Sequence, residues 1–254
     1  MLIELDVRDH IGYLALNRPD ALNAINRALM DDLDAALNRV ASDARIRVLI
    51  LSGRGRAFCA GSDIKDLAGV SSADAERIVR REAELCQRFE TLPQPTIAAV
   101  EGYALGGGAA LLLYQNIRVA SETAVFGLPE VTLGWNPAFG MARLTRLIGR
   151  GWASDLLLTG RTIAAHEALA IGLVDRVVPA ASLMETAETL AKQIAENPIA
   201  GVRAIKAILR VEEEMPLAKT DDYELRVFEQ CAGTDDAQAQ IRAFVRRSHR
   251  RKAP

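Results

Sequence analysis

The residues most suited to a catalytic role lie in two glycine-rich turns, each of which follows an apolar run. The second holds three glycines, 106–108, directly before the apolar residues 109–113. Glycine has no Cβ, so a ligand can approach the main chain closely, and the first N–H groups of a helix lie at the positive end of its dipole. Such a turn suits an oxygen that gains negative charge during a reaction. Close packing of a helix against a strand would use the same glycines, and the turn alone leaves both interpretations open.

Other chemistries that use glycines, serines or histidines do not fit. The first turn, residues 53–64, has Phe58 where a dinucleotide-binding motif needs its third glycine, and the second has Leu111 there. Neither turn ends in the Gly-Lys-Ser/Thr of a P-loop, and no serine stands in a G-x-S-x-G motif. The histidines form no metal-ligand or triad pattern. They are His10, His166 and His249.

Composition limits the class of protein. The chain has 254 residues, half of them hydrophobic, and a formal net charge of -2, which argues against a dedicated nucleic-acid binder. No apolar run approaches the roughly 20 residues that span a bilayer, and the first residues lack a signal-peptide pattern. Three scattered cysteines are too few for a disulfide framework. We therefore expect no membrane association and a cytoplasmic location.

The elements that must position the two turns follow from apolar periodicity. The sequence predicts strands at 11–16, 48–51, 96–100 and 117–120, and helices at 21–40 and 75–91. From residue 152 onward the pattern is helical almost throughout, interrupted at 172–179. Beyond Asn197-Pro198 we expect helices near 199–213, 221–231 and 235–247. This order predicts an α/β core over residues 1–196 and a helical region over 197–254.

With their downstream context, the turns resemble the crotonase (enoyl-CoA hydratase/isomerase) family. The resemblance implies an α/β fold in which ββα units form a spiral, with a helical C-terminal region that drives trimer formation. Trimers of this family often pair into hexamers. The resembling segments run in order between about residues 11 and 248: 16–24, 57–65, 101–108, 126–134, 158–161 and 168–179.

The resemblance also implies the site. The substrate would be an acyl-CoA thioester, with coenzyme A as part of the substrate and no separate cofactor or metal. The N–H groups of Ser62 and Gly107 correspond to the family's oxyanion hole, and Glu130 to a catalytic glutamate. Ser62 stands where the family often has alanine. The residues that would contact substrate are Ala21, Leu22, Ala60, Asp63, Ile64, Lys65, Gly106, Trp135 and Phe139.

One departure from the family bears on the reaction. Hydratases of the family use two glutamates, and Ala110 occupies the position of the first. A methyl group cannot move a proton, so we expect Glu130 to be the sole acid–base in double-bond isomerisation or hydration of an enoyl-CoA. Decarboxylation, thioester hydrolysis or non-catalytic acyl-CoA or RNA binding are the alternatives. Tyr103 and Tyr114 are possible additional acids or ordinary packing residues.

Three further residues and the tail have two interpretations each. Trp135, Asn136 and Phe139 would shape the acyl pocket or simply pack beneath a loop. The basic run 246–252 is either a solvated end or a contact for the phosphates of coenzyme A. Phe244 matches a family aromatic in the same region.

Overall fold

The computed structural model describes residues 1–212, 217–232, 234, 237–240 and 242. The chain divides into two compact units, residues 1–192 and 193–254, each described below by itself. This division lies a few residues before the boundary expected at Asn197-Pro198, inside helix α7 (Leu183–Ala195).

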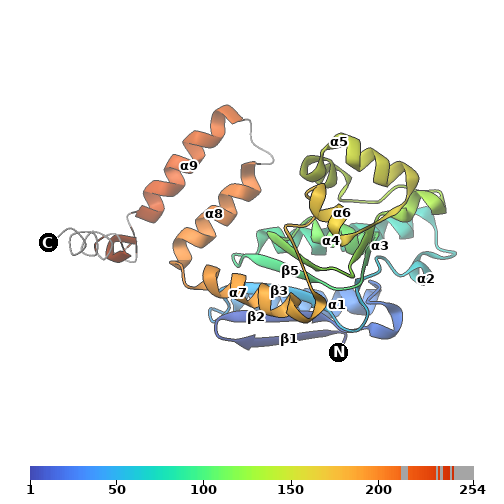
Figure 1. The fold of residues 1–254 in the computed structure, drawn as a ribbon, viewed down its shortest axis with the longest axis horizontal. Helices are drawn as coiled ribbons and strands as arrows, with labels where there is room; N and C mark the ends of the chain where they lie inside the picture. Colours follow the sequence, from blue (N-terminus) through green and yellow to red (C-terminus); the bar gives the residue numbers. More distant parts are fainter. Residues whose placement is uncertain (213–216, 233, 235–236, 241, 243–254) are drawn as a thin grey trace. The chain divides into compact units, whose positions relative to one another are not determined.

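A six-stranded sheet forms the base of the first unit in the described residues (Figure 1). Its order is β1-β2-β3-β5-β7-β10, and all neighbouring strands except β1 and β2 run parallel. The four predicted strands are confirmed, whereas β1 was missed and β10 lies in the segment 172–179, which was predicted only to interrupt the helices. The strands are β1 (Ile3–Arg8), β2 (Ile11–Leu16), β3 (Val48–Gly53), β5 (Thr96–Val100), β7 (Ile117–Ser121) and β10 (Arg176–Val178).

A second sheet of four short strands carries the chemistry-bearing turns. β4 (Ala57–Cys59), β6 (Tyr103–Leu105) and β8 (Val125–Gly127) pair in parallel, and β9 (Thr162–Ala164) pairs antiparallel with β8. Each parallel member follows a strand of the large sheet, so β3-β4, β5-β6 and β7-β8 repeat one pattern. The repeat brings the ends of β4 and β6 side by side, with Cys59 opposite Ala104.

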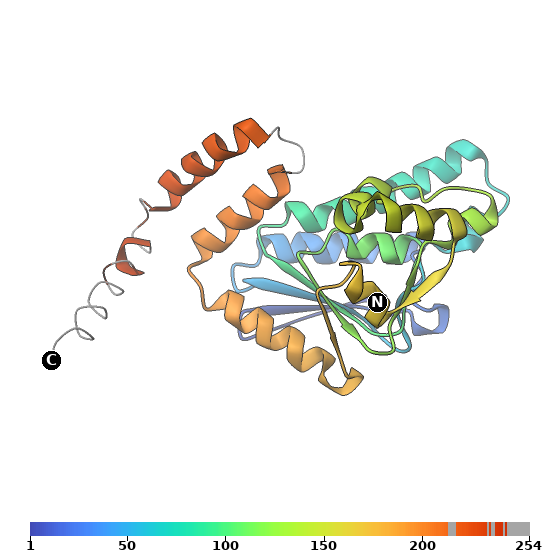
Figure 2. The same cartoon turned by 45° about the horizontal axis from the view of Figure 1, so that its top comes forward.

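Helices cover both faces of the large sheet (Figure 2). On one face, α1 (Arg27–Ser42) packs against α3 (Ser72–Thr91), and α7 lies on the other. The prediction of a helix from residue 21 was wrong at its start, because Leu22 and Asn23 have positive φ angles of 52° and 57°. The helix begins only after Asn26, whose side chain accepts a hydrogen bond from the N–H of Leu29.

Helices of 3 to 19 residues connect these elements, and one prediction about the later part of the chain was wrong. A helical pattern almost throughout after residue 152 is wrong at β9, where Ile163 is buried between exposed neighbours. The two-residue period of a three-residue strand is too short to distinguish from a helix. The connecting helices are η1 (Pro19–Ala21), α2 (Ile64–Leu67), α4 (Gly107–Leu112), η2 (Pro129–Leu133), α5 (Met141–Thr159), α6 (Ala165–Ala170) and η3 (Ala180–Ser182).

The second unit contains the paired helices α8 (Ile199–Glu212) and α9 (Leu217–Ala232). They confirm the helices predicted near 199–213 and 221–231. The helix predicted at 235–247 falls largely outside the described residues, and Phe244 and the tail 246–252 do so entirely. Among the helices that the structure describes, none is long and apolar enough to cross a membrane.

Candidate active site

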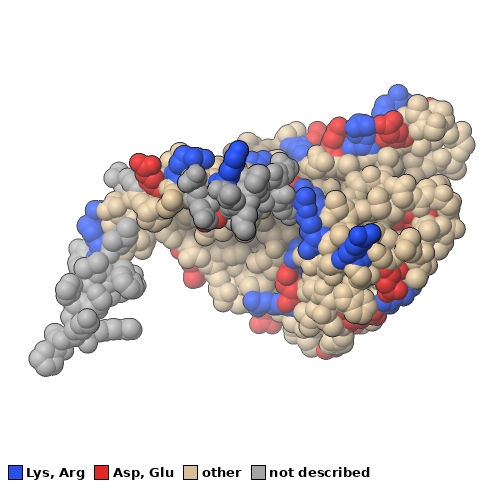
Figure 3. All heavy atoms as spheres, turned by 90° about the horizontal axis from the view of Figure 1, so that it is seen from above, with Lys and Arg blue, Asp and Glu red and all other residues tan. Residues whose placement is uncertain are grey.

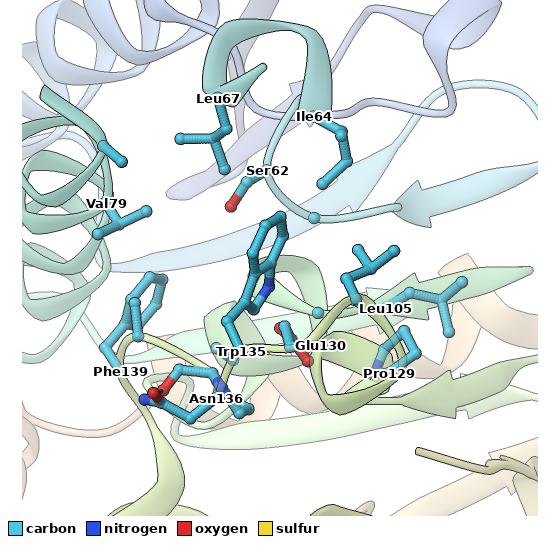
Figure 4. A pocket seen from close by; sticks show the side chains of 18 of the residues that line it. Ser62, Ile64, Leu67, Val79, Leu105, Pro129, Glu130, Trp135, Asn136 and Phe139 are labelled. Atoms are coloured by element: carbon cyan, nitrogen blue, oxygen red, sulfur yellow. Dashed lines mark hydrogen bonds between the residues drawn. The ribbon is translucent and has the colours of Figure 1, made fainter. Parts of the chain in front are cut away.

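A cavity of about 670 Å³ opens in the first unit where the turns after β4 and β6 meet α3 and η2. Figure 4 shows Ser62, Ile64 and Leu67 toward one side of it and Pro129, Glu130 and Trp135 toward the other. Most of the lining is apolar, which suits the hydrocarbon part of a ligand. The lining residues are Ala60, Gly61, Ser62, Ile64, Leu67, Ser72, Ala75, Glu76, Val79, Leu105, Gly106, Gly107, Ala110, Pro129, Glu130, Leu133, Trp135, Asn136, Pro137, Ala138 and Phe139.

Two main-chain N–H groups, those of Ser62 and Gly107, adjoin at this cavity. A Cβ on Gly107 would lie 3.4 Å from the nitrogen of Ser62. Among the backbone hydrogen bonds of the described residues, neither nitrogen donates. Gly107 is the first residue of α4, so its N–H has no partner within the helix. Two free donors therefore stand together beside a cavity.

Glycines at two positions, Gly61 and Gly108, make this approach possible. A Cβ on Gly61 would meet the carbonyl oxygen of Leu105 at 2.7 Å and the nitrogen of Gly107 at 3.0 Å. A Cβ on Gly108 would lie only 2.1 Å from the carbonyl oxygen of Cys59. The packing interpretation of the triple glycine is therefore confirmed at Gly108, while the interpretation of the turn as a site for a charged oxygen stays a prediction.

A buried asparagine holds the first turn in place. Asn23 is fully buried, and its side-chain amide donates to the carbonyl oxygens of Arg54 at 3.0 Å and Ala57 at 2.7 Å. Its side-chain oxygen accepts from the nitrogen of Arg18 at 2.8 Å. The sequence placed Asn23 in a family-like segment but assigned it no role; the preference of asparagine for turns was the available signal.

Main-chain hydrogen bonds from the same segment hold the turn from both sides. The nitrogen of Ala60 donates to the oxygen of Leu22 at 2.9 Å, and that of Ile25 to the oxygen of Gly61 at 2.8 Å. The nitrogen of Asp63 donates back to the oxygen of Ile25 at 2.8 Å. Leu22 therefore supports the turn through its main chain.

The carboxyl group of Glu130 lies over the second turn. Its Oε1 is 3.0 Å from the position that a Cβ on Gly106 would occupy, and its Oε2 is buried with no hydrogen-bond partner in the described part of the chain. Burial raises the pKa of Glu130 above its ordinary value of 4.5. A carboxylate with a raised pKa is a stronger base, which suits Glu130 to proton transfer.

Ala110 lines the same cavity from α4, one turn beyond Gly107, and is almost fully buried. The two tyrosines considered as additional acids lie outside the cavity lining. Tyr103 is exposed on β6, and Tyr114 is buried with the guanidinium of Arg143 4.6 Å above its ring. The position that lacks a glutamate is thus at the cavity wall.

The structure brings together eight of the twelve predicted site residues. Those that line the cavity are Glu130, Ser62, Gly107, Ala60, Ile64, Gly106, Trp135 and Phe139. The others, Ala21, Leu22, Asp63 and Lys65, lie outside its lining.

The side chain of Asp63 has structural partners instead. Its carboxylate pairs with Arg18 at 2.7 Å and accepts from the nitrogen of Lys65 at 3.1 Å, at the start of α2. Burial opposes ionisation, but these hydrogen bonds outweigh it and lower the pKa of Asp63. The Arg18–Asp63 pair fixes the chain just beyond the Ser62 donor.

Glu82 is a site residue that the sequence interpretation missed. It lies on α3, is 1% exposed, and its Oε2 accepts a hydrogen bond from the hydroxyl of Ser62 at 2.6 Å. The available signal was a glutamate in an otherwise apolar stripe, between Ile78 and Leu85.

In the described residues, no three His, Cys, Asp or Glu side chains gather as metal ligands would.

Comparisons with known proteins identify close similarity along the whole chain. A family model described as enoyl-CoA hydratase/isomerase matches residues 6–252. A probable enoyl-CoA hydratase of Mycobacterium tuberculosis is 39% identical, over 96% of this chain and 94% of its own. The short-chain-enoyl-CoA hydratase of Clostridium acetobutylicum is 35% identical, over 95% and 93%. The crystal structure of enoyl-CoA hydratase from Bacillus anthracis superposes with a TM-score of 0.93, at 38% identity and 97% coverage of both chains.

Proposed function

Because the chain belongs to the enoyl-CoA hydratase/isomerase family and is an enzyme of that type, we propose that it stabilises the enolate of an enoyl-CoA thioester between the N–H groups of Ser62 and Gly107, with Glu130 as its acid–base. The observation that carries this proposal is the pair of free, adjoining main-chain donors beside the buried carboxyl group of Glu130. The crotonase-like fold expected from the sequence is confirmed.

The proposed reaction is a shift of the double bond. Glu130 removes a proton from the carbon next to the thioester carbonyl of a 3-enoyl-CoA, and the electron pair moves onto the carbonyl oxygen. Ser62 and Gly107 donate to that oxygen as its charge develops, an interaction whose loss typically costs about 10²–10³-fold in rate. The protonated Glu130 then returns the proton to the γ-carbon, which places the double bond next to the carbonyl.

Hydration of a 2-enoyl-CoA is the second candidate, because the relatives named above are hydratases. The same donors would bear the enolate formed when water adds. Ala110 offers no carboxyl group to hold that water, so Glu130 would have to serve both the water and the α-carbon. Decarboxylation and thioester hydrolysis are further candidates, because both reactions would use the same two N–H donors.

RNA binding receives less support from the charge distribution. On the face drawn in Figure 3, lysine and arginine side chains are interspersed with aspartate and glutamate, and much of the described surface is uncharged. Affinity for nucleic acid normally depends on clustered cations.

We also propose a homotrimer or a hexamer assembled through the second unit. Large apolar side chains on α8 and α9 are more than half exposed, and such a surface favours association. They are Ile205, Leu209, Leu225 and Phe228.

Replacement of the proposed base tests the function. We expect Glu130→Gln to abolish turnover of 2-enoyl- and 3-enoyl-CoA thioesters while the variant still binds them, because the amide keeps the shape of the side chain but takes up no proton. Mass spectrometry of the products would distinguish isomerisation from hydration. Full turnover by the variant would contradict the assignment of Glu130.

A further inference from the structure

The buried glutamate of α3 has no role in the reaction as proposed. Glu82 occupies a helix face that is otherwise apolar, and its Oε1 has no hydrogen-bond partner in the described part of the chain. A buried carboxylate is unfavourable unless it is paired, so a glutamate at this position needs a physical explanation. Within the described residues, its one hydrogen bond is accepted from the hydroxyl of Ser62, a residue of the proposed oxyanion hole.

The carboxyl group of Glu82 lies close to both proposed donors. Its Oε2 is 3.4 Å from the position that a Cβ on Gly107 would take. The nitrogen and the hydroxyl oxygen of Ser62 are each at that same distance from this position. The carboxyl group therefore stands next to the two residues whose N–H groups would bear the enolate charge.

The surroundings of Glu82 favour its neutral form. Among the described residues, the titratable groups that face it are Asp66 of α2, Cys59 of β4 and Cys86 on its own helix. None of these groups is a cation. Burial raises the pKa of Glu82 to about 7; the hydrogen bond from Ser62 opposes this rise and the charge of Asp66 adds to it. Near neutral pH the residue therefore changes its charge.

We propose that Glu82 is a positioning residue that controls the oxyanion hole through Ser62. When neutral, Glu82 donates its proton to the hydroxyl oxygen of Ser62, and the serine hydrogen is free to point into the cavity as a third donor to the enolate. When ionised, Glu82 accepts the serine hydrogen and places a negative charge beside the enolate. The inference rests on the proposed function of the Ser62 and Gly107 N–H groups.

The two forms should differ in activity. The ionised carboxylate and the enolate would repel each other enough, at an effective dielectric constant of about 20, to weaken enolate stabilisation on the order of 10- to 100-fold. Activity should therefore decline as pH rises through the range in which Glu82 ionises. The proposal also gives the side chain of Ser62 a role that alanine could not fill, because the serine hydroxyl links the carboxyl group of Glu82 to the cavity.

The test compares Glu82→Gln with the unchanged enzyme across pH 5.5–9. The amide of glutamine donates to Ser62 at every pH and carries no charge, so we expect the variant to lose the alkaline decline in kcat/KM. Glu84→Gln is the matched control, because Glu84 is exposed on the same helix, and it should keep the decline. If Glu82→Gln and the unchanged enzyme have the same pH profile, the inference is wrong.

A second variant covers the case in which Glu82→Gln fails to fold. Ser62→Ala keeps the main-chain N–H but removes the hydrogen bond that lowers the pKa of Glu82. The alkaline decline should therefore move to higher pH. An unmoved or acid-shifted decline would overturn the inference.

Binding of a 3-oxoacyl-CoA, whose enolate absorbs in the ultraviolet, separates this inference from the proposed function. We expect the enolate to bind, and to bind on the order of tenfold or more tightly to Glu82→Gln than to the unchanged enzyme at pH 8.5. If no enolate binds, the oxyanion hole fails and both proposals fall. If it binds equally to the two proteins at that pH, only the role of Glu82 is refuted.

Discussion

Oε1 of Glu130 lies 3.0 Å from the point where a Cβ on Gly106 would stand. Gly106 has φ 52° and ψ -125°, a conformation that residues with a side chain rarely adopt. The glycine thus serves both the turn that presents the N–H of Gly107 and the space that the proposed base occupies.

Gly106→Ala should damage catalysis more than stability. The methyl group would push against the carboxyl group of Glu130, and we expect kcat to fall on the order of 100-fold, comparable to the loss of an oxyanion donor. The backbone strain should cost about 1–3 kcal/mol of folding free energy. Kinetics and thermal unfolding measure the two effects.

Gly69→Ala is the matched control for that variant. Gly69 also has a positive φ, 75°, but a Cβ there would meet nothing within 4 Å, and the residue lies outside the cavity lining. We expect Gly69→Ala to lose folding free energy through backbone strain but to keep its kcat unchanged. An equal loss of kcat in both variants would mean that strain alone, rather than the position of Glu130, explains the effect.

The acid limb of the pH profile should lie above the ordinary range of a glutamate. The base works when ionised, and burial raises the pKa of Glu130, so kcat/KM of the free enzyme should fall as pH drops through a value above 4.5. The limb is measured with a substrate at concentrations below KM. A limb at or below 4.5 would show that the carboxyl group is solvated or paired in solution.

Ala110→Glu should raise hydration relative to isomerisation. The new carboxyl group would project from the cavity wall on the face of α4 that holds the Gly107 donor, where it could orient water. We expect the rate of water addition to a 2-enoyl-CoA to increase by tenfold or more, since a positioned acid–base group typically contributes about 10²–10⁴-fold. Ala110→Gln adds the same volume without the carboxylate and should lower both activities. If the two variants behave alike, steric change and not proton transfer dominates at this position.

Asn23→Ala should destabilise the fold and loosen the first turn. The change leaves the buried carbonyl oxygen of Ala57 without its 2.7 Å donor and removes a residue suited to a left-handed conformation. We expect a loss of about 3 kcal/mol in the free energy of unfolding by denaturant. Asn17→Ala removes an exposed hydrogen bond to Glu4 and should cost less than about 1 kcal/mol. Equal costs for the two would contradict the anchoring role of Asn23.

The sequence alone was sufficient for the elements whose apolar pattern is unambiguous. β3 carries four consecutive apolar residues, 48–51, because it is buried on both faces, and that run predicts the strand. α3 was predicted to end before Pro93, as it does. β1 was missed, since only Ile3 of its six residues is buried and the others alternate between exposed and partly exposed, so it has no apolar run. The start of α1 was misplaced because positive φ angles at Leu22 and Asn23 leave no periodic signal.

The sequence therefore determined the family, the two glycine turns and the departure at Ala110, because these depend on residue types at fixed spacing along the chain. Only the tertiary structure decided that the hydroxyl of Ser62 meets the carboxyl group of Glu82, twenty residues away, and that Oε2 of Glu130 is buried with no partner among the described residues. The charge of a buried carboxyl group depends on what surrounds it in three dimensions. Segments distant in the sequence supply those surroundings, and they come together only when β4, β6, η2 and α3 pack around one cavity.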